Sequence, residues 1–376
     1  MRTKHRKHAK TNSTRKNKKK AGIIFNKDIF DNTSIALKSY VPTINQQLVS
    51  LQSADREEVE HCNNKNAFLL KEPLQVMVKH KCHPYYYKGA QEMLLEKLKA
   101  NKHLDASKMI TPVQSHSNCW FNTMFVVFFM SDKGRKFFHF FRQLMIQGKQ
   151  VNGANIPSKI WSAFALLNYA IECCLTGDKY AYKVNTNSVI RQIYLSIPDS
   201  FKKGGNYLVD VDFANNPVYY YESLMKYLQV NGLERVILHA HNEDWRAQLE
   251  HKVLGSAHPP HYIIMEIFDG QEETPGASGK IKNKEVEIKV GNYVYALDSA
   301  IIRDIEQNHF SAVLTVEKKE YAYDGASFHR VVPMKWKRNL NKTTKWGFKG
   351  SDYPDKTPLQ WSFCHGYQML FYYRTK

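Results

Sequence analysis

Residues 118–130 have the sequence NCWFNTMFVVFFM and include the most apolar run of this 376-residue chain. Asn118 is a residue type that commonly precedes a helix, and large apolar side chains follow it at almost every position. Such a helix is apolar around nearly its whole circumference, so we expect it to be buried on most sides. Asn122 and Thr123 interrupt the run, which is also too short to cross a bilayer, so it indicates the core helix of a globular protein.

The pattern on either side of this helix predicts its partners. Ser131 or Asp132 can begin a second helix that ends at Gly148, and residues 158–177 predict a third. Beyond about residue 234 the spacing of apolar residues changes from the helical period to the alternation typical of strands. We expect shorter helices at 188–196 and 218–228, a flexible loop at 269–284, and strands at 236–240, 262–268, 285–290, 293–297, 309–316, 320–324 and 367–373. This order predicts an α+β fold, with a helical N-terminal half around the helix that begins at Cys119 and a strand-rich C-terminal half.

The composition is that of a folded protein with a basic extension. Hydrophobic residues make up 43% of the chain and charged residues 24%, which excludes a disordered or collagen-like protein. Lys and Arg exceed Asp and Glu by 19, and residues 1–20 contain ten of these cations and no acid. We therefore expect a basic disordered tail (1–22), an N-terminal extension of unknown role (23–110) and a main domain (111–376). The tail has the charge of a segment that meets nucleic acid or an import receptor.

The six cysteines are too few and too scattered for a disulfide framework, which favours a reducing, intracellular environment. The N-terminus has no apolar segment of the kind found in secretory signals, and we expect no association with a membrane. A zinc site is not expected, because the available ligands lack the close CxxC pairs typical of such sites. These ligands are His61, Cys62, His80, Cys82 and His83.

Cys119 is the first candidate for chemistry. A thiol at the N-terminus of a buried helix lies at the positive end of the helix dipole, which stabilises the nucleophilic thiolate. Gln114 and Asn118 lie just upstream, where they can donate hydrogen bonds to an oxyanion. The alternative is that Cys119 is a buried structural cysteine.

A predicted hairpin supplies two further candidates. His309 opens one strand and Asp324 closes the next, so both lie at the same end of the hairpin. A carboxylate in that place can orient the imidazole and determine its tautomer, as in a catalytic triad. The alternative is a surface histidine beside an ordinary Asp324-Gly325 turn.

Taken in order, these segments resemble the ubiquitin-specific proteases. Residues 118–123 are similar to the family's cysteine box and residues 295–312 to its histidine box. The resemblance extends over residues 260–268, 323–324 and 366–374. Asn308 stands where the family has glycine, and the paired CxxC motifs of its zinc-bearing fingers are absent. This pattern suits a divergent member, such as one encoded by a large DNA virus.

The resemblance implies a papain-like cysteine peptidase that removes ubiquitin or a ubiquitin-like modifier from proteins. Cys119 is then the nucleophile, His309 the general base and acid, and Asp324 the residue that orients His309. Gln114 is the oxyanion donor and Asn118 a possible support. This chemistry needs no metal or cofactor, and the partners are ubiquitin and its conjugates. The expected location is the nucleus or cytoplasm of a host cell, or a virion.

Three alternatives remain open at this level. His309, Asp324, Gln360 and Cys364 follow the His–Asp–Gln–Cys order of SUMO-protease-like peptidases, which would make Cys364 the nucleophile. Alternatively, the triad of Cys119, His309 and Asp324 could cleave a viral polyprotein. A third possibility is a catalytically silent protein associated with nucleic acid. The basic stretch 335–349 is either a solvated loop or a second nucleic-acid contact, and the tryptophans near it are expected to be core residues.

Overall fold

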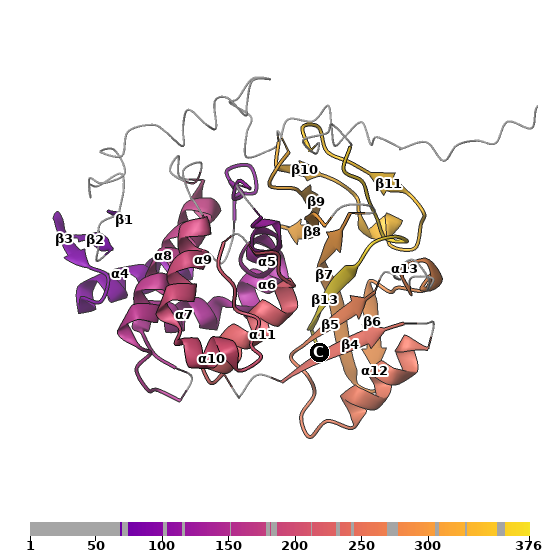
Figure 1. Cartoon of the computed structure of the whole chain (residues 1–376), viewed down its shortest axis with the longest axis horizontal. Coiled ribbons are helices and arrows are strands. Elements are labelled where there is room, and N and C mark those ends of the chain that lie inside the picture. The colour runs from indigo at the N-terminus through magenta and orange to yellow at the C-terminus, as the bar shows by residue number, and fades with distance from the viewer. Residues whose placement is uncertain are drawn as a thin grey trace, which may run out of the picture.

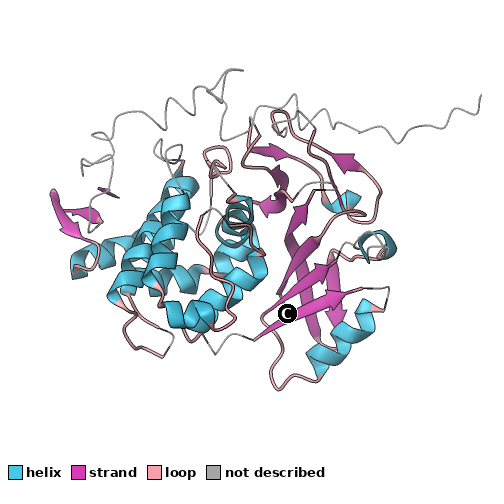
Figure 2. Ribbon diagram, viewed as in Figure 1, coloured by secondary structure: helices cyan, strands magenta, loops and turns pink. Residues whose placement is uncertain are grey.

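The fold is seen in a computed structural model of the chain. It describes residues 68–69, 74–100, 104–114, 117–150, 152–177, 181, 186–211, 213–230, 234–241, 244–268, 277–304, 308–327, 329–351 and 358–376. The predicted tail 1–22 and residues 23–67 of the predicted extension lie outside these. Most of the helices gather on one side and a large sheet forms the other (Figure 2). The predicted α+β organisation is therefore confirmed.

The helical half is built around α5 (Cys119–Phe129), in which every residue is buried. The prediction for α8 (Ser158–Thr176) is confirmed, including the left-handed Gly177 that ends it. The remaining helices of this half surround them (Figure 1): α6 (Asp132–Phe137), α7 (His139–Gln147), α9 (Thr186–Ser196), α10 (Asp199–Lys203) and α11 (Pro217–Tyr227).

The prediction of a single helix from residue 131 to Gly148 is wrong. The segment forms α6 and α7, which meet at Phe138, where ψ is 8°. The Phe138 ring is buried, with its centroid 4.7 Å from that of Phe128 and 5.5 Å from that of Tyr221. Burial of this ring in the core therefore accompanies the change in chain direction between the two helices.

The N-terminus of α6 lies too close to α5 to accept a side chain at Gly134. A Cβ atom there would lie 2.2 Å from the carbonyl oxygen of Val127 and 2.6 Å from Ser131 Oγ. We expect Gly134→Ala to lower the free energy of unfolding by about 1–3 kcal/mol, measured by urea denaturation. Gly279→Ala is the control, because its Cβ would meet only Cys364 O at 3.6 Å. Equal stability of the two variants would contradict this account of the packing.

The strand-rich half is one eight-stranded sheet in the order β10-β9-β8-β7-β13-β5-β4, with β6 paired to β7. All pairs are antiparallel except β4 with β5. The last strand of the chain, β13, lies in the middle of the sheet, between β7 and β5. The strands are β4 (Arg235–Ala240), β5 (Tyr262–Ile267), β6 (Glu287–Val290), β7 (Tyr293–Arg303), β8 (Phe310–Val316), β9 (Lys319–Tyr323), β10 (Val331–Pro333) and β13 (Gln368–Arg374).

Both faces of the sheet are covered, which explains why every residue of β5 is buried. Alternate side chains of a strand point to opposite faces. Tyr262 and Ile264 belong to the core under the helical half, whereas Ile263 and Met265 belong to a second core on the other face. That second face is covered by α12 (Trp245–Leu254) and by the chain around α13 (Ala277–Lys280), η3 (Lys337–Asn339), β11 (Lys345–Trp346) and β12 (Trp361–Ser362).

Several elements were not predicted. The extension contains a small sheet of β1 (Phe68–Leu69), β2 (Gln75–Val78) and β3 (Lys81–Pro84), followed by α4 (Lys88–Ala100). Helices α10 and α12 were missed as well. No helix of the described residues has the length and apolar character needed to span a membrane.

Candidate active site

Cys119 is the first residue of α5, and its side chain is buried. The next residue anchors this end of the helix. The Trp120 ring centroid lies 4.8 Å from that of Tyr220 on α11, and the indole N–H donates to the carbonyl of Phe213 at 3.2 Å. The contacts of Trp120 therefore hold the start of α5 in place, with the thiol at the positive end of the helix dipole.

Asn118 occupies the expected position before α5, but its side chain makes no capping hydrogen bond. Its amide instead donates to Thr186 Oγ1 at 2.9 Å and to Asn187 Oδ1 at 2.7 Å, both on α9. Its side-chain oxygen, Oδ1, accepts from Asn122 Nδ2 at 3.2 Å. Asn118 therefore precedes the helix as expected, but its buried side chain connects α5 to α9 and does not cap α5.

The hairpin of β8 and β9 brings His309 and Asp324 together. Ala312 pairs with Tyr323, so the ends of the two strands meet. His309 Nε2 lies 2.7 Å from Asp324 Oδ1, and both side chains are buried. Because Nε2 is bound to the carboxylate, the other ring nitrogen, Nδ1, is left to interact with groups on the far side of the ring from Asp324.

Cys119 lies close enough to His309 for its side chain to favour the protonated imidazole. Burial disfavours the imidazolium, but the Asp324 carboxylate and the Cys119 side chain outweigh it and raise the pKa of His309 to about 10. A protonated His309 at neutral pH is the form that stabilises a thiolate beside it.

Gln114 approaches the same ring, with its Nε2 3.4 Å from His309 Nδ1. Its backbone N–H donates to the carbonyl of Gly325 at 2.9 Å, which links the chain before α5 to the turn after Asp324. A Cβ at Gly325 would lie 3.0 Å from this backbone nitrogen, so the close approach suits glycine. The structure thus brings Cys119, His309, Asp324 and Gln114 together, while the amide of Asn118 points to α9.

Three further residues hold the histidine and the aspartate, and the sequence carried no signal for any of them. The buried Ser351 hydroxyl donates to Asp324 Oδ2. The Asp304 carboxylate accepts the backbone N–H of His309 at 3.1 Å. The Trp361 indole N–H donates to the carbonyl of His309 at 3.3 Å. These contacts restrain His309 on both its backbone and its ring.

Cys364, the alternative nucleophile, lies in a turn between β12 and β13 and not at the start of a helix. Its Sγ donates to the carbonyl of Lys342 at 3.2 Å, and its backbone N–H donates to Ser362 Oγ at 3.1 Å. The arrangement of Cys119 is therefore better suited to nucleophilic chemistry than that of Cys364.

The other cysteines differ from the expectation at one position. Cys82 is disulfide-bonded, whereas Cys173 and Cys174 are free and buried. Burial raises the pKa of Cys174 to about 12, as expected for an inert core thiol. The described residues contain no group of three or more His, Cys, Asp and Glu side chains placed to hold a metal ion.

Three aromatic rings pack together at the ends of β5, β8 and β13. The Tyr367 ring lies 6.4 Å from that of Phe310 and 5.6 Å from that of Phe268. The Tyr367 hydroxyl donates to the buried carboxylate of Glu266, which lies 2.7 Å from His239 Nδ1. Burial raises the pKa of Glu266 to about 7.

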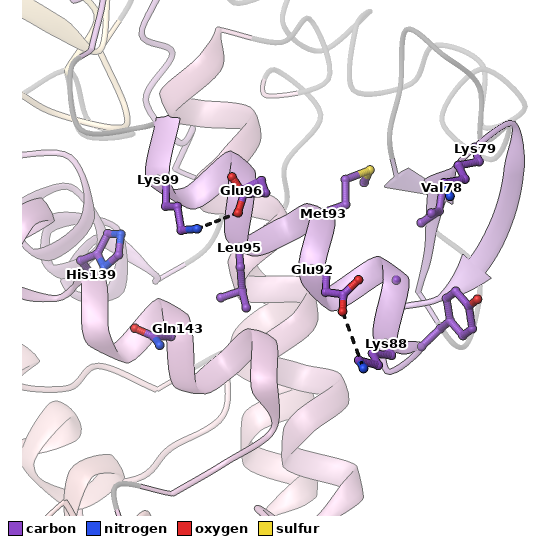
Figure 3. Close-up of a pocket in the computed structure, with 12 residues that line it drawn as sticks. Val78, Lys79, Lys88, Glu92, Met93, Leu95, Glu96, Lys99, His139 and Gln143 are labelled. Atoms are coloured by element: carbon purple, nitrogen blue, oxygen red, sulfur yellow. Dashed lines mark hydrogen bonds and ion pairs between the residues drawn. The ribbon is translucent and has the colours of Figure 1, made fainter.

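A separate cavity of about 820 Å³ lies between the β2–β3 turn, α4 and α7 (Figure 3). Its lining contains none of the candidate site residues. Two of its lysines are already paired, Lys88 with Glu92 at 3.9 Å and Lys99 with Glu96 at 2.6 Å. This cavity is therefore unrelated to the cysteine site.

No family model matches this chain, and no curated protein matches it. Among solved structures it is similar to the SAGA Ubp8/Sgf11/Sus1/Sgf73 DUB module bound to monoubiquitin, with a TM-score of 0.45 and 7% identity over 72% of this chain and 70% of that chain. The same module bound to ubiquitin aldehyde gives a TM-score of 0.44, also at 7% identity and the same coverage. An essential yeast splicing factor gives 0.34 at 9% identity, again over 72% and 70%. These TM-scores are too low to assign a function, so the function is inferred from the side chains of the site.

Proposed function

We propose that the protein is a papain-like cysteine peptidase that removes ubiquitin or a ubiquitin-like modifier from its conjugates. One observation carries the proposal: the buried His309 binds Asp324 through Nε2 and contacts Cys119, which begins a buried helix. This placement supplies a nucleophile, a proton carrier and an orienting carboxylate in contact with one another.

In the proposed reaction, the proton of Cys119 resides on His309, which is protonated at neutral pH, and the Cys119 thiolate attacks the carbonyl carbon of the scissile amide. Gln114 Nε2 and the backbone N–H of Cys119 donate to the oxyanion of the tetrahedral intermediate. His309 then protonates the departing amine, which leaves a thioester on Cys119. Water, deprotonated by His309, attacks the thioester carbonyl, and the C–S bond breaks to release the product with a free C-terminal carboxyl group. Cys119 leaves as the thiolate beside the protonated His309, which restores the starting state.

The substrate class follows from the motifs that resemble the ubiquitin-specific proteases, at residues 118–123 and 295–312. The position of His309 directly before β8 of the large sheet supports this choice, because an extended chain is the form of substrate that binds beside strands. Ubiquitin-type modifiers end in such a chain, which can bind to strands by main-chain hydrogen bonds.

The test is covalent labelling by ubiquitin that carries a thiol-reactive electrophile at its C-terminus. We expect an adduct with the wild type and with Cys364→Ala, and none with Cys119→Ala. Labelling that persists in Cys119→Ala and disappears in Cys364→Ala would overturn the assignment of the nucleophile. Reaction of Cys119 with a small haloacetamide but not with the ubiquitin probe would overturn the substrate class alone, and a peptide library would then be screened.

A further inference from the structure

Two segments of the strand-rich half carry cations and no acids. Residues 329–351 contain seven Lys or Arg and no Asp or Glu, and residues 277–284 contain three Lys and no acid. Most of these cations have exposed side chains. Five exposed cations near the contact between the two segments form what we call the basic surface: Lys280, Lys282, Lys335, Arg338 and Lys342.

The two segments lie side by side. The backbone N–H of Lys284 donates to Asn341 Oδ1 at 2.8 Å, and Asn341 Nδ2 donates to the Lys284 carbonyl at 2.8 Å. The buried Lys284 ammonium donates to the carbonyls of Ile281, Leu340 and Phe363 at 2.7, 3.3 and 3.0 Å. The chain around α13 is thus joined to the segment between η3 and β11 (Figure 1).

A packed layer of aromatic rings lies beneath the basic surface. Trp336 and Trp346 are buried, with ring centroids 6.1 and 5.2 Å from that of Phe363. The Trp336 indole N–H also donates to the carbonyl of Leu314 on β8 at 3.3 Å. The exposed cations Lys335 and Arg338 flank this buried tryptophan, so their backbone is anchored to the sheet. The segment is therefore a folded platform and not a solvated loop.

The cations of the basic surface make no ion pair with any acid of the described residues. Some cations elsewhere on the protein are paired, such as Lys202 with Asp199 at 2.8 Å and Arg235 with Glu222 at 3.2 Å. Unpaired cations gathered on one platform produce a positive potential that attracts a polyanion.

We propose that the basic surface binds the phosphate backbone of double-stranded nucleic acid. The Trp and Phe rings of the two described segments are all buried, so the surface offers no platform on which unpaired bases could stack. Contacts through Lys and Arg alone recognise phosphates, which are the same in every sequence. The binding is therefore independent of base sequence and does not involve Cys119.

The test uses the full chain and a 24-base-pair DNA duplex, with binding followed by fluorescence anisotropy at KCl concentrations from about 50 to 200 mM. The charge-reversal variant is Lys282→Glu/Arg338→Glu/Lys342→Glu. Each lost phosphate contact makes the slope of log K against log[KCl] shallower by about 0.9, so we expect a change of about 2–3 in the slope. The affinity at the lowest salt should fall by more than tenfold.

The matched control reverses three exposed cations of the helical half, Lys136→Glu/Lys159→Glu/Lys203→Glu, and therefore has the same net charge. Thermal melts of both variants are measured to check that each one is folded. The proposal is overturned if the two variants bind the duplex equally, or if the wild type binds polyglutamate as tightly as the duplex. Cys119→Ala should bind the duplex as the wild type does, so this result is separate from that of ubiquitin labelling.

Discussion

Replacing Asp324 by asparagine should lower the turnover of a fluorogenic ubiquitin substrate by about 10⁴-fold, if the proposed triad acts on such a substrate. The carboxylate accepts from His309 Nε2, from Ser351 and from the backbone N–H of Ala326, so it is held in one orientation. Asparagine preserves the size of the side chain but removes the charge that stabilises the imidazolium. It can also favour the wrong tautomer of His309.

The pH profile gives this prediction a second readout. Asp324 raises the pKa of His309 above its ordinary value of 6.5, to about 10, against the effect of burial. The imidazolium therefore persists through neutral pH in the wild type, and its contribution to stability is lost only as the pH rises through about 10. In Asp324→Asn, burial dominates and the pKa falls, so the alkaline limb of kcat/KM should move to lower pH.

Asp298→Asn is the control for Asp324→Asn. Asp298 is equally buried in the same sheet, but it accepts the backbone N–H groups of Lys133 and Gly134 at the start of α6. We expect this variant to melt at a lower temperature while its pH profile stays that of the wild type. An Asp324→Asn enzyme with turnover within tenfold of the wild type would contradict the role of Asp324.

Much of the helical half and the hairpin could be predicted because their signals are local. In α5, apolar residues on all sides predict a helix with no solvent-facing side. In α8, periodicity and the final Gly177 define both the helix and its end. The sequence also placed His309 and Asp324 at the same end of the hairpin, but the register that brings them into contact came from the structure.

Other features depend on contacts between distant parts of the chain. Ser351 lies 27 residues from Asp324, and no local pattern links a single serine to that carboxylate. Helix α12 buries only Trp245, Leu249 and Val253 on an otherwise polar sequence. The β2–β3 turn places Lys79 and His80 at positive φ without a glycine to indicate it. In each case the tertiary environment, and not the local sequence, determines the structure.

A buried ion pair between α7 and α8 gives the largest expected effect on stability. Arg142 donates to Glu172 Oε2 at 2.8 Å and to Asn168 Oδ1 at 2.9 Å, and both charged side chains are buried. Burial lowers the pKa of Arg142, and the Glu172 carboxylate partly opposes this. We expect Arg142→Met to lower the free energy of unfolding by about 3–5 kcal/mol in urea, because it removes the cation that faces a buried carboxylate.

The double variant Arg142→Met/Glu172→Met separates loss of the pair from loss of packing. Two apolar side chains of similar volume leave no buried charge, so this variant should recover most of the stability lost by Arg142→Met. Arg235→Met is the control for an exposed pair, since Arg235 and Glu222 are both partly open to solvent, and it should cost about 0–1 kcal/mol. If the double variant were less stable than Arg142→Met, the ion pair could not be the source of the loss, and the packing of the arginine stem between the two helices would have to explain it.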